Sequence, residues 1–160
     1  MKFVAVDIQG FCTPDFQPKE LAIYDGKEMK SYIFKPKIPW RSLPEDSKKQ
    51  AKYLYGNHHG LHYNYGETAY DDLYSIIYNN LRDVDTIYVK GRIKQDFLVK
   101  IFNELKYNSS IIVNLENISS NIPKFQKGHT ICSYHDLDIC VCSVKNAELL
   151  YNCIVNSSSK

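Results

Sequence analysis

The sequence lacks any apolar run approaching the roughly 18 residues that a membrane-spanning helix requires, so we expect no membrane segment. Its first residues, MKFVAVDIQGF, contain neither the apolar core nor the small-residue cleavage site of a secretory signal peptide, and we interpret them as a strand. Internal repeats and low-complexity segments are also absent. We therefore expect an intracellular protein, of the cytoplasm or nucleus, in which thiols stay reduced.

A large net charge is lacking as well. The 20 basic and 18 acidic residues leave a formal charge of +2, which argues against a strongly basic surface over the whole molecule. A local strip of cations that binds nucleic acid is still compatible with this balance. The candidates on a predicted helix are Lys48, Lys49 and Lys52. The candidates at the turn after a predicted strand are Lys90, Arg92 and Lys94.

Aromatic residues follow the first group of cations. Tyr53 and Tyr55 come directly after Lys52, which would place stacking platforms for single-stranded nucleic acid beside positive charge. The alternative interpretation is that the lysines form the solvated face of an amphipathic helix.

The five cysteines include no C-x-x-C pair, which argues against a thioredoxin-like redox site. Three of them lie in CSYHDLDICVC, residues 132–142. Cys132 and His135 are three positions apart, a spacing at which both side chains can face one ion across a tight turn. Cys142, or else Cys140, would return as a third ligand from the start of the last helix.

A fourth ligand must come from elsewhere in the chain. The loop GNHHGLHYN offers His58, His59 and His62. We favour His59, because the flexible backbone of Gly60 would let its ring turn inward; Glu116 is the carboxylate alternative. The predicted metal ligands are thus His59, Cys132, His135 and Cys142. Thiolate and imidazole donors suit a structural Zn²⁺, whereas the alternative is that the cysteines only fill the core.

Hydrophobic periodicity predicts one domain over residues 1–155 and a flexible tail at 156–160. Strands are expected at 2–8, 18–25, 29–36, 85–91 and 110–116. Helices are expected at 45–55, 68–81, 94–105 and 143–155. The order β-β-β-α-α-β-α-β-α fits an α/β fold with a mixed sheet and a central first strand. This order, a three-strand antiparallel meander followed by α-α-β-α-β-α, resembles that of ribonuclease-H-like domains.

Short motifs resemble those of DEDD 3′–5′ exonucleases, which have this fold. That family carries D-x-E on its first strand to hold two divalent ions; here the pattern reads Asp7-x-Gln9. In VKGRIKQDFL (89–98), Gln95 falls where the family has an Asp. In VCSVKNAELL (141–150), Val141 replaces the general base and Asn146 the last Asp. Because one carboxylate of four remains, we expect no catalytic residues and a vestigial Asp7.

A scaffold that has lost these carboxylates and gained a Cys/His metal site resembles the Maelstrom domain, a module of germline small-RNA pathways with a Glu-Cys-His-Cys zinc motif. Cys132, His135 and Cys142 match its Cys, His and Cys, and His59 or Glu116 would stand for the Glu. The segments VDIQGF, HGLHY and YVKG also resemble uncharacterised insect proteins of viral or transposon origin.

These resemblances imply a catalytically inactive, zinc-stabilised domain that binds single-stranded RNA or a protein of a nucleic-acid pathway. Two other functions stay open. An active metal-dependent nuclease would use Asp7 in a rearranged site with Asp96, Asp136 or Asp138. A protein-interaction adaptor of viral or transposon origin would bind no RNA at all.

Overall fold

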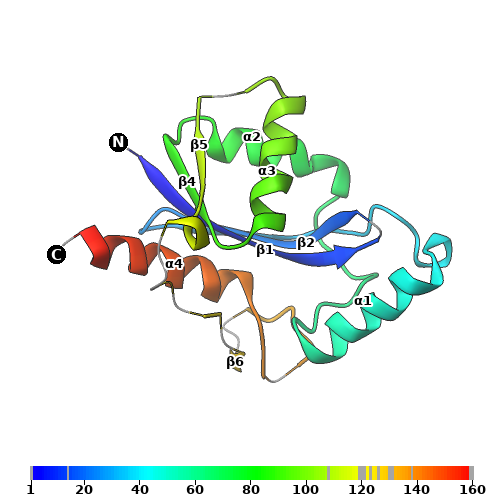
Figure 1. Cartoon of the computed structure of the whole chain (residues 1–160). Helices are drawn as coiled ribbons and strands as arrows, with labels where there is room; N and C mark the ends of the chain where they lie inside the picture. Colours follow the sequence, from blue (N-terminus) through cyan, green and yellow to red (C-terminus); the bar gives the residue numbers. More distant parts are fainter. Residues whose placement is uncertain are drawn as a thin grey trace.

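The computed structural model is a mixed α/β structure in which helices cover both faces of a five-stranded sheet (Figure 1). The structure describes residues 2–13, 15–107, 109–118, 122, 124–125, 127–129, 132–137 and 139–158.

The sheet has the strand order β3-β2-β1-β4-β5. The strands are β1 (Phe3–Cys12), β2 (Phe16–Tyr24), β3 (Met29–Ile33), β4 (Thr86–Val89) and β5 (Ile111–Asn114). β1 pairs antiparallel with β2 and parallel with β4, and β4 pairs parallel with β5. The expected antiparallel meander with a central first strand is therefore confirmed.

β1 is longer than predicted. The sequence suggested that it ends at residue 8, but the strand continues to Cys12 and β2 already begins at Phe16. A bulge between Gln9 and Gly10 lets the strand pass Pro18, which pairs opposite Gly10. Proline has no N–H to donate to the ladder, and a bulge is one of the places where a sheet accepts it. The sequence predicts a turn over residues 10–18, which is too long because the proline is taken as a strand boundary.

The four predicted helices are all present: α1 (Glu45–Asn57), α2 (Leu73–Leu81), α3 (Arg92–Glu104) and α4 (Ser143–Ser158). A 3₁₀ turn, η2 (Tyr70–Asp72), precedes α2 where the prediction began a helix at residue 68. α4 continues through positions 156–158, which the prediction assigned to a flexible tail. None of the described helices is both long enough and apolar enough to cross a membrane.

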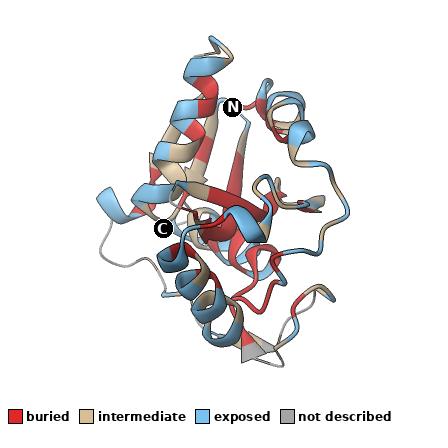
Figure 2. Ribbon diagram, turned by 90° about the vertical axis from the view of Figure 1, so that its right-hand side faces the viewer, coloured by how far each residue is buried: buried red, intermediate tan, exposed pale blue. Residues whose placement is uncertain are grey.

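One face of the sheet forms the main apolar core with α2 and α3. Side chains alternate between the two faces of a strand, so Val4, Val6 and Ile8 of β1 all point to this face. They pack against buried residues of the two helices: Leu73, Ile77, Leu81, Leu98, Ile101 and Phe102. Figure 2 shows buried residues concentrated along the central strands and exposed residues along the outer sides of the helices.

The opposite face of the sheet is covered by α4 (Figure 1). Several side chains at this interface are alanines. Ala22 packs in a cluster with Ala147, and Ala5 packs in a cluster with Leu150. Small side chains let the helix lie close to β1 and β2. The polar residues of these strands that share this face therefore come to lie under the first turns of α4.

Along the chain, a short two-stranded sheet comes between β5 and α4. It pairs β6 (Gly128–His129) with β7 (Ile139–Cys140) in antiparallel orientation. A 3₁₀ turn, η3 (Leu115–Asn117), follows β5 directly.

Candidate metal centre

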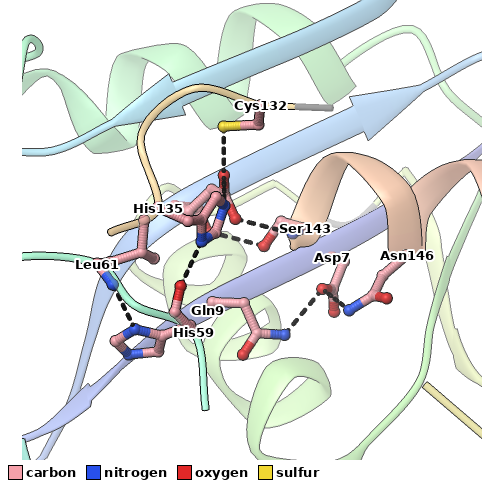
Figure 3. Close-up of polar contacts among 9 residues, drawn as sticks. Asp7, Gln9, His59, Leu61, Cys132, His135, Ser143 and Asn146 are labelled. Carbon is pink, nitrogen blue, oxygen red and sulfur yellow. Dashed lines mark hydrogen bonds and ion pairs between the residues drawn. The ribbon is translucent and has the colours of Figure 1, made fainter. Parts of the chain in front are cut away.

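Four side chains from three parts of the chain meet at the N-terminus of α4. Figure 3 shows two of them, Cys132 and His135, beside Ser143 at the start of this helix. Glu20 comes from β2, Cys132 and His135 from the turn before β7, and Cys142 from the residue before α4. Their ligand atoms all lie within 4.8 Å of one another. Among the described residues, this is the single group of three or more His, Cys, Asp or Glu side chains placed to hold an ion.

The spacing of the donors suits a four-coordinate ion. Glu20 Oε2 lies 3.1 Å from His135 Nε2 and 3.3 Å from Cys132 Sγ. Ligands at ordinary zinc bond lengths of about 2.0–2.3 Å in a tetrahedron are roughly 3.3–3.8 Å apart. The donor atoms thus lie at separations that a single ion of this kind can bridge with small shifts.

Backbone groups hold two of the donors in orientation. His135 Nδ1 donates to the backbone carbonyl of His59, so Nε2 is the ring nitrogen that faces Glu20 and is placed to bind an ion. The N–H of Ser143, in the first turn of α4, donates to Glu20 Oε1 at 2.8 Å. Hydrogen bonds of this type commonly orient metal ligands and fix the tautomer of a ligating histidine.

The electrostatics of the cluster favour a cation. A hydrogen bond with Cys142, burial and the neighbouring Glu20 raise the pKa of the Cys132 thiol. Burial lowers the pKa of His135, but hydrogen bonds with Cys142 and Glu20 outweigh this and raise it to about 11. Cys132 and His135 therefore retain their protons when no other cation is near. A divalent ion can replace those protons, which couples metal binding to their release.

His59, predicted as the fourth ligand, does not belong to the cluster; Glu20 supplies the fourth donor instead. The His59 ring is fully buried and both its nitrogens are engaged. Nδ1 accepts the N–H of Leu61 at 3.0 Å, and Nε2 donates to the carbonyl of Gly10 at 3.2 Å. Burial lowers the pKa of His59 to about 3, so its ring is neutral. Its contribution to the site is the carbonyl that orients His135.

The other ligand candidates also lie outside the cluster: His58, His62, Glu116 and Cys140. Sequence reasoning missed Glu20 because it treated the residue as an ordinary position of the second strand. The available signal was an acidic residue within the apolar run of a strand that neighbours β1. Cys132, His135 and Cys142 are brought together as predicted.

A second polar group lies beside the cluster and contains three of the residues that match the exonuclease motifs: Asp7, Gln9 and Asn146 (Figure 3). Gln95 lies outside this group, with its amide 3.4 Å from the carbonyl of Ile112. Asp7 is fully buried and accepts hydrogen bonds from Gln9 Nε2 at 3.0 Å and Asn146 Nδ2 at 2.9 Å. Lys94 Nζ lies 2.5 Å from Asp7 Oδ1. An ammonium group thus neutralises the carboxylate that the motif would present to metal ions.

The carboxylates of the predicted alternative nuclease have partners elsewhere. Asp96 is exposed and pairs with Arg92 at 3.6 Å. Asp136 is exposed and accepts a hydrogen bond from the Tyr55 hydroxyl at 2.7 Å. Asp138 lies outside the described residues.

The predicted nucleic-acid-binding cations differ in their availability. Lys49 and Lys52 are exposed on α1, whereas Lys48 is half-buried and pairs with Glu45 at 3.5 Å. Lys94 has a side chain only 17% exposed and is engaged with Asp7, so it is not free to contact a phosphate.

The other two cations of this predicted group, near the start of α3, have contacts as well. Lys90 lies over the ring of Phe125, 4.7 Å from its centroid. Arg92 is exposed.

No family model, curated protein or solved structure matches this chain.

Proposed function

We propose that the protein is a ribonuclease-H-like domain that is held together by a structural zinc ion, lacks a nuclease centre and binds single-stranded RNA. The observation that carries this proposal is the pairing of two neighbouring sites. Two sulfurs, an imidazole and a carboxylate converge at Cys132, Cys142, His135 and Glu20, while a lysine neutralises Asp7.

The strand order supports the scaffold. A central β1, an antiparallel meander on one side and parallel β4 and β5 on the other give the mixed sheet expected of ribonuclease-H-like domains. Asp7, Gln9 and Asn146 meet on this sheet although 139 positions separate the first from the last. Three positions that the exonuclease comparison treats as metal-binding are therefore neighbours, which is what that comparison requires.

The donor set supports zinc as the ion. Two sulfurs and one imidazole are poor ligands for Mg²⁺ or Ca²⁺, which select oxygen, and good ligands for Zn²⁺. Four protein donors fill a tetrahedral site and leave no position for a substrate, as in structural zinc centres. An ion here would tie β2, the turn before β7 and the start of α4 together. Its role is to stabilise the fold.

The position of Glu20 supports the resemblance to the Maelstrom domain. That domain's zinc motif is Glu-Cys-His-Cys, and the cluster of this chain offers the same four residue types. The Glu lies in β2 rather than at residue 116, and this order along the chain places it before Cys132, His135 and Cys142.

Exposed groups on α1 support RNA as the partner. Lys49 and Lys52 are exposed, and Tyr53, which follows Lys52, is 63% exposed. Positive charge beside a stacking surface is typical of proteins that bind single strands without base pairing.

Metal analysis of the purified chain tests the zinc centre. We expect one equivalent of zinc in the wild type, none in Cys132→Ser, and a full equivalent in Cys153→Ser, a control residue on α4 outside the cluster. Absence of metal from the wild type after purification in zinc-containing buffer, with no uptake on addition, contradicts the proposal.

Nucleic-acid assays test the two other parts of the proposal, RNA binding and the lack of nuclease activity. Labelled single-stranded RNA should bind at low salt, more weakly as salt rises, and should stay intact with Mg²⁺ or Mn²⁺. Cleavage that Asp7→Asn abolishes would establish an active nuclease instead. Failure to bind RNA at low salt would favour a protein-interaction adaptor.

A further inference from the structure

A pocket with aromatic walls opens between α1 and the loop that follows it. Trp40 comes from the 3₁₀ turn η1 (Trp40–Ser42), Tyr55 from α1, and His62 and Tyr63 from the loop. Its volume is about 190 Å³. A cavity of roughly 150 Å³ admits one benzene ring, and sites for drug-sized ligands occupy about 300–1,000 Å³. The pocket therefore has the size of one planar, nucleobase-like ring system.

Two of the aromatic walls are held in place by contacts behind them. Tyr63 is 6% exposed, and its ring lies edge-on to Trp40 with the centroids 5.3 Å apart. The Tyr63 hydroxyl donates to the carbonyl of Ile38 at 2.5 Å and accepts from Gln17 Nε2 at 3.2 Å. Because these contacts order the walls in advance, a ligand loses little affinity to side-chain ordering.

Polar groups at the rim have unused hydrogen-bonding capacity. Within the described part of the chain, the side chains of Trp40, Lys52 and Asn64 have no hydrogen-bond or ion-pair partner. The Asn64 amide offers one donor group and one acceptor, the combination that pairs with the edge of a base. The exposed ammonium of Lys52 is available to a phosphate.

We propose that this pocket takes one nucleotide of a single-stranded RNA, with its base between the aromatic side chains and its phosphate at Lys52. This inference rests on the proposed function and adds where the RNA is held. Charge favours a nucleotide over an aromatic side chain of a peptide, because Lys52 lines the pocket and Lys49 is exposed on the same helix. Stacking on aromatic side chains explains binding without base pairing.

Trp40 makes the pocket directly observable, because it is the only tryptophan of the chain. Its indole N–H gives a single resonance in a nitrogen-correlated NMR spectrum of the zinc-loaded protein. We expect AMP and UMP to shift this resonance saturably. Ribose 5-phosphate, which lacks a base, and N-acetylphenylalaninamide, which lacks a phosphate, should bind at least about tenfold more weakly.

A matched pair of charge reversals separates the phosphate contact from a general electrostatic effect. Lys52→Glu should weaken AMP binding by about tenfold or more, since it removes a charged hydrogen bond. Lys100→Glu, at an exposed position on α3 outside the pocket, should change it less than about twofold. Equal effects of the two substitutions overturn the phosphate assignment.

The remaining outcomes distinguish failure of the pocket assignment from failure of the proposed function. If no nucleotide moves the Trp40 resonance while single-stranded RNA still binds at low salt, this pocket assignment is wrong and the proposed function stands. If RNA binding fails too, the proposed function fails. A saturable response to N-acetylphenylalaninamide alone identifies a peptide site and overturns the nucleotide proposal.

Discussion

Lys94 Nζ lies 2.5 Å from Asp7 Oδ1, and this ion pair joins the first turn of α3 to the central strand of the sheet. Asp7 is fully buried and the Lys94 side chain is 17% exposed. A charge in such a place requires a partner, because an isolated buried charge is costly. The lysine therefore stabilises the fold at the position where the exonuclease motif would hold a metal ion.

Removal of the lysine alone should be strongly destabilising. Lys94→Met leaves the Asp7 carboxylate buried without an opposite charge, and we expect the free energy of unfolding to fall by about 3–5 kcal/mol. Urea denaturation at neutral pH measures the change. Lys100→Met, at an exposed position of the same helix, should cost less than about 0.5 kcal/mol.

A double variant tests whether the cost arises from the unpaired charge. Asp7→Asn combined with Lys94→Met removes both charges and should recover most of the lost stability. Additive effects of the two substitutions would mean that the ion pair is not the cause.

Glu20→Gln should weaken zinc binding while it preserves the shape of the side chain. The substitution removes one negative charge from the donor set, and we expect the affinity to fall by more than about 100-fold, since even residues that only orient ligands contribute about 10–100-fold. Competition with a chromophoric chelator measures it. Glu116→Gln, exposed in η3, is the control and should bind zinc as the wild type does; indistinguishable affinities of the two variants would exclude Glu20 as a ligand.

His59 should make stability depend on pH in the acidic range. Burial lowers its pKa from 6.5 to about 3. Between these two pH values the imidazole is protonated in the unfolded chain and neutral in the folded chain. The contribution of neutral His59 to the free energy of unfolding is complete above pH 6.5. It is lost as the pH falls toward 3, at up to about 1.4 kcal/mol per pH unit. In His59→Gln this part of the slope disappears, because glutamine does not titrate.

Urea denaturation of both proteins, saturated with zinc, between pH 7.5 and 5 measures the difference. The stability advantage of the wild type over His59→Gln should shrink by about 2 kcal/mol across this range. Parallel pH profiles of the two proteins would show that His59 does not carry the effect.

Gly10 and Gly56 should respond in opposite ways to alanine. A Cβ at Gly10 would lie 2.2 Å from the Gln17 carbonyl oxygen, across the bulge between β1 and β2. We expect a loss of about 1–3 kcal/mol or more, because the backbone must shift. A Cβ at Gly56, near the end of α1, meets nothing within 4 Å, and alanine there should add about 0.5–1 kcal/mol. Thermal unfolding of the two variants, compared with the wild type, measures both effects; equal shifts would contradict the packing at the bulge.

The order of elements and the short-range part of the metal cluster follow from local patterns. Alternating apolar residues predict β1, and helical periodicity predicts α1 to α4, because each pattern reflects the geometry of a single element. Cys132 and His135 were recognised as partners because three positions in one turn set their distance. The ends of β1 and β2 were misjudged because a bulge, which depends on the pairing of two strands, absorbs Pro18.

Local patterns in the sequence predict which elements form and which short spacings bring donors together, since both depend on neighbours along the chain. The packing of distant elements places Glu20, and not His59, in the cluster, and it brings Lys94 to Asp7 instead of to solvent. These outcomes depend on how α3 and α4 dock on the sheet and on which way a ring turns. Such relations join residues more than 80 positions apart, and spacing along the chain carries no information about them.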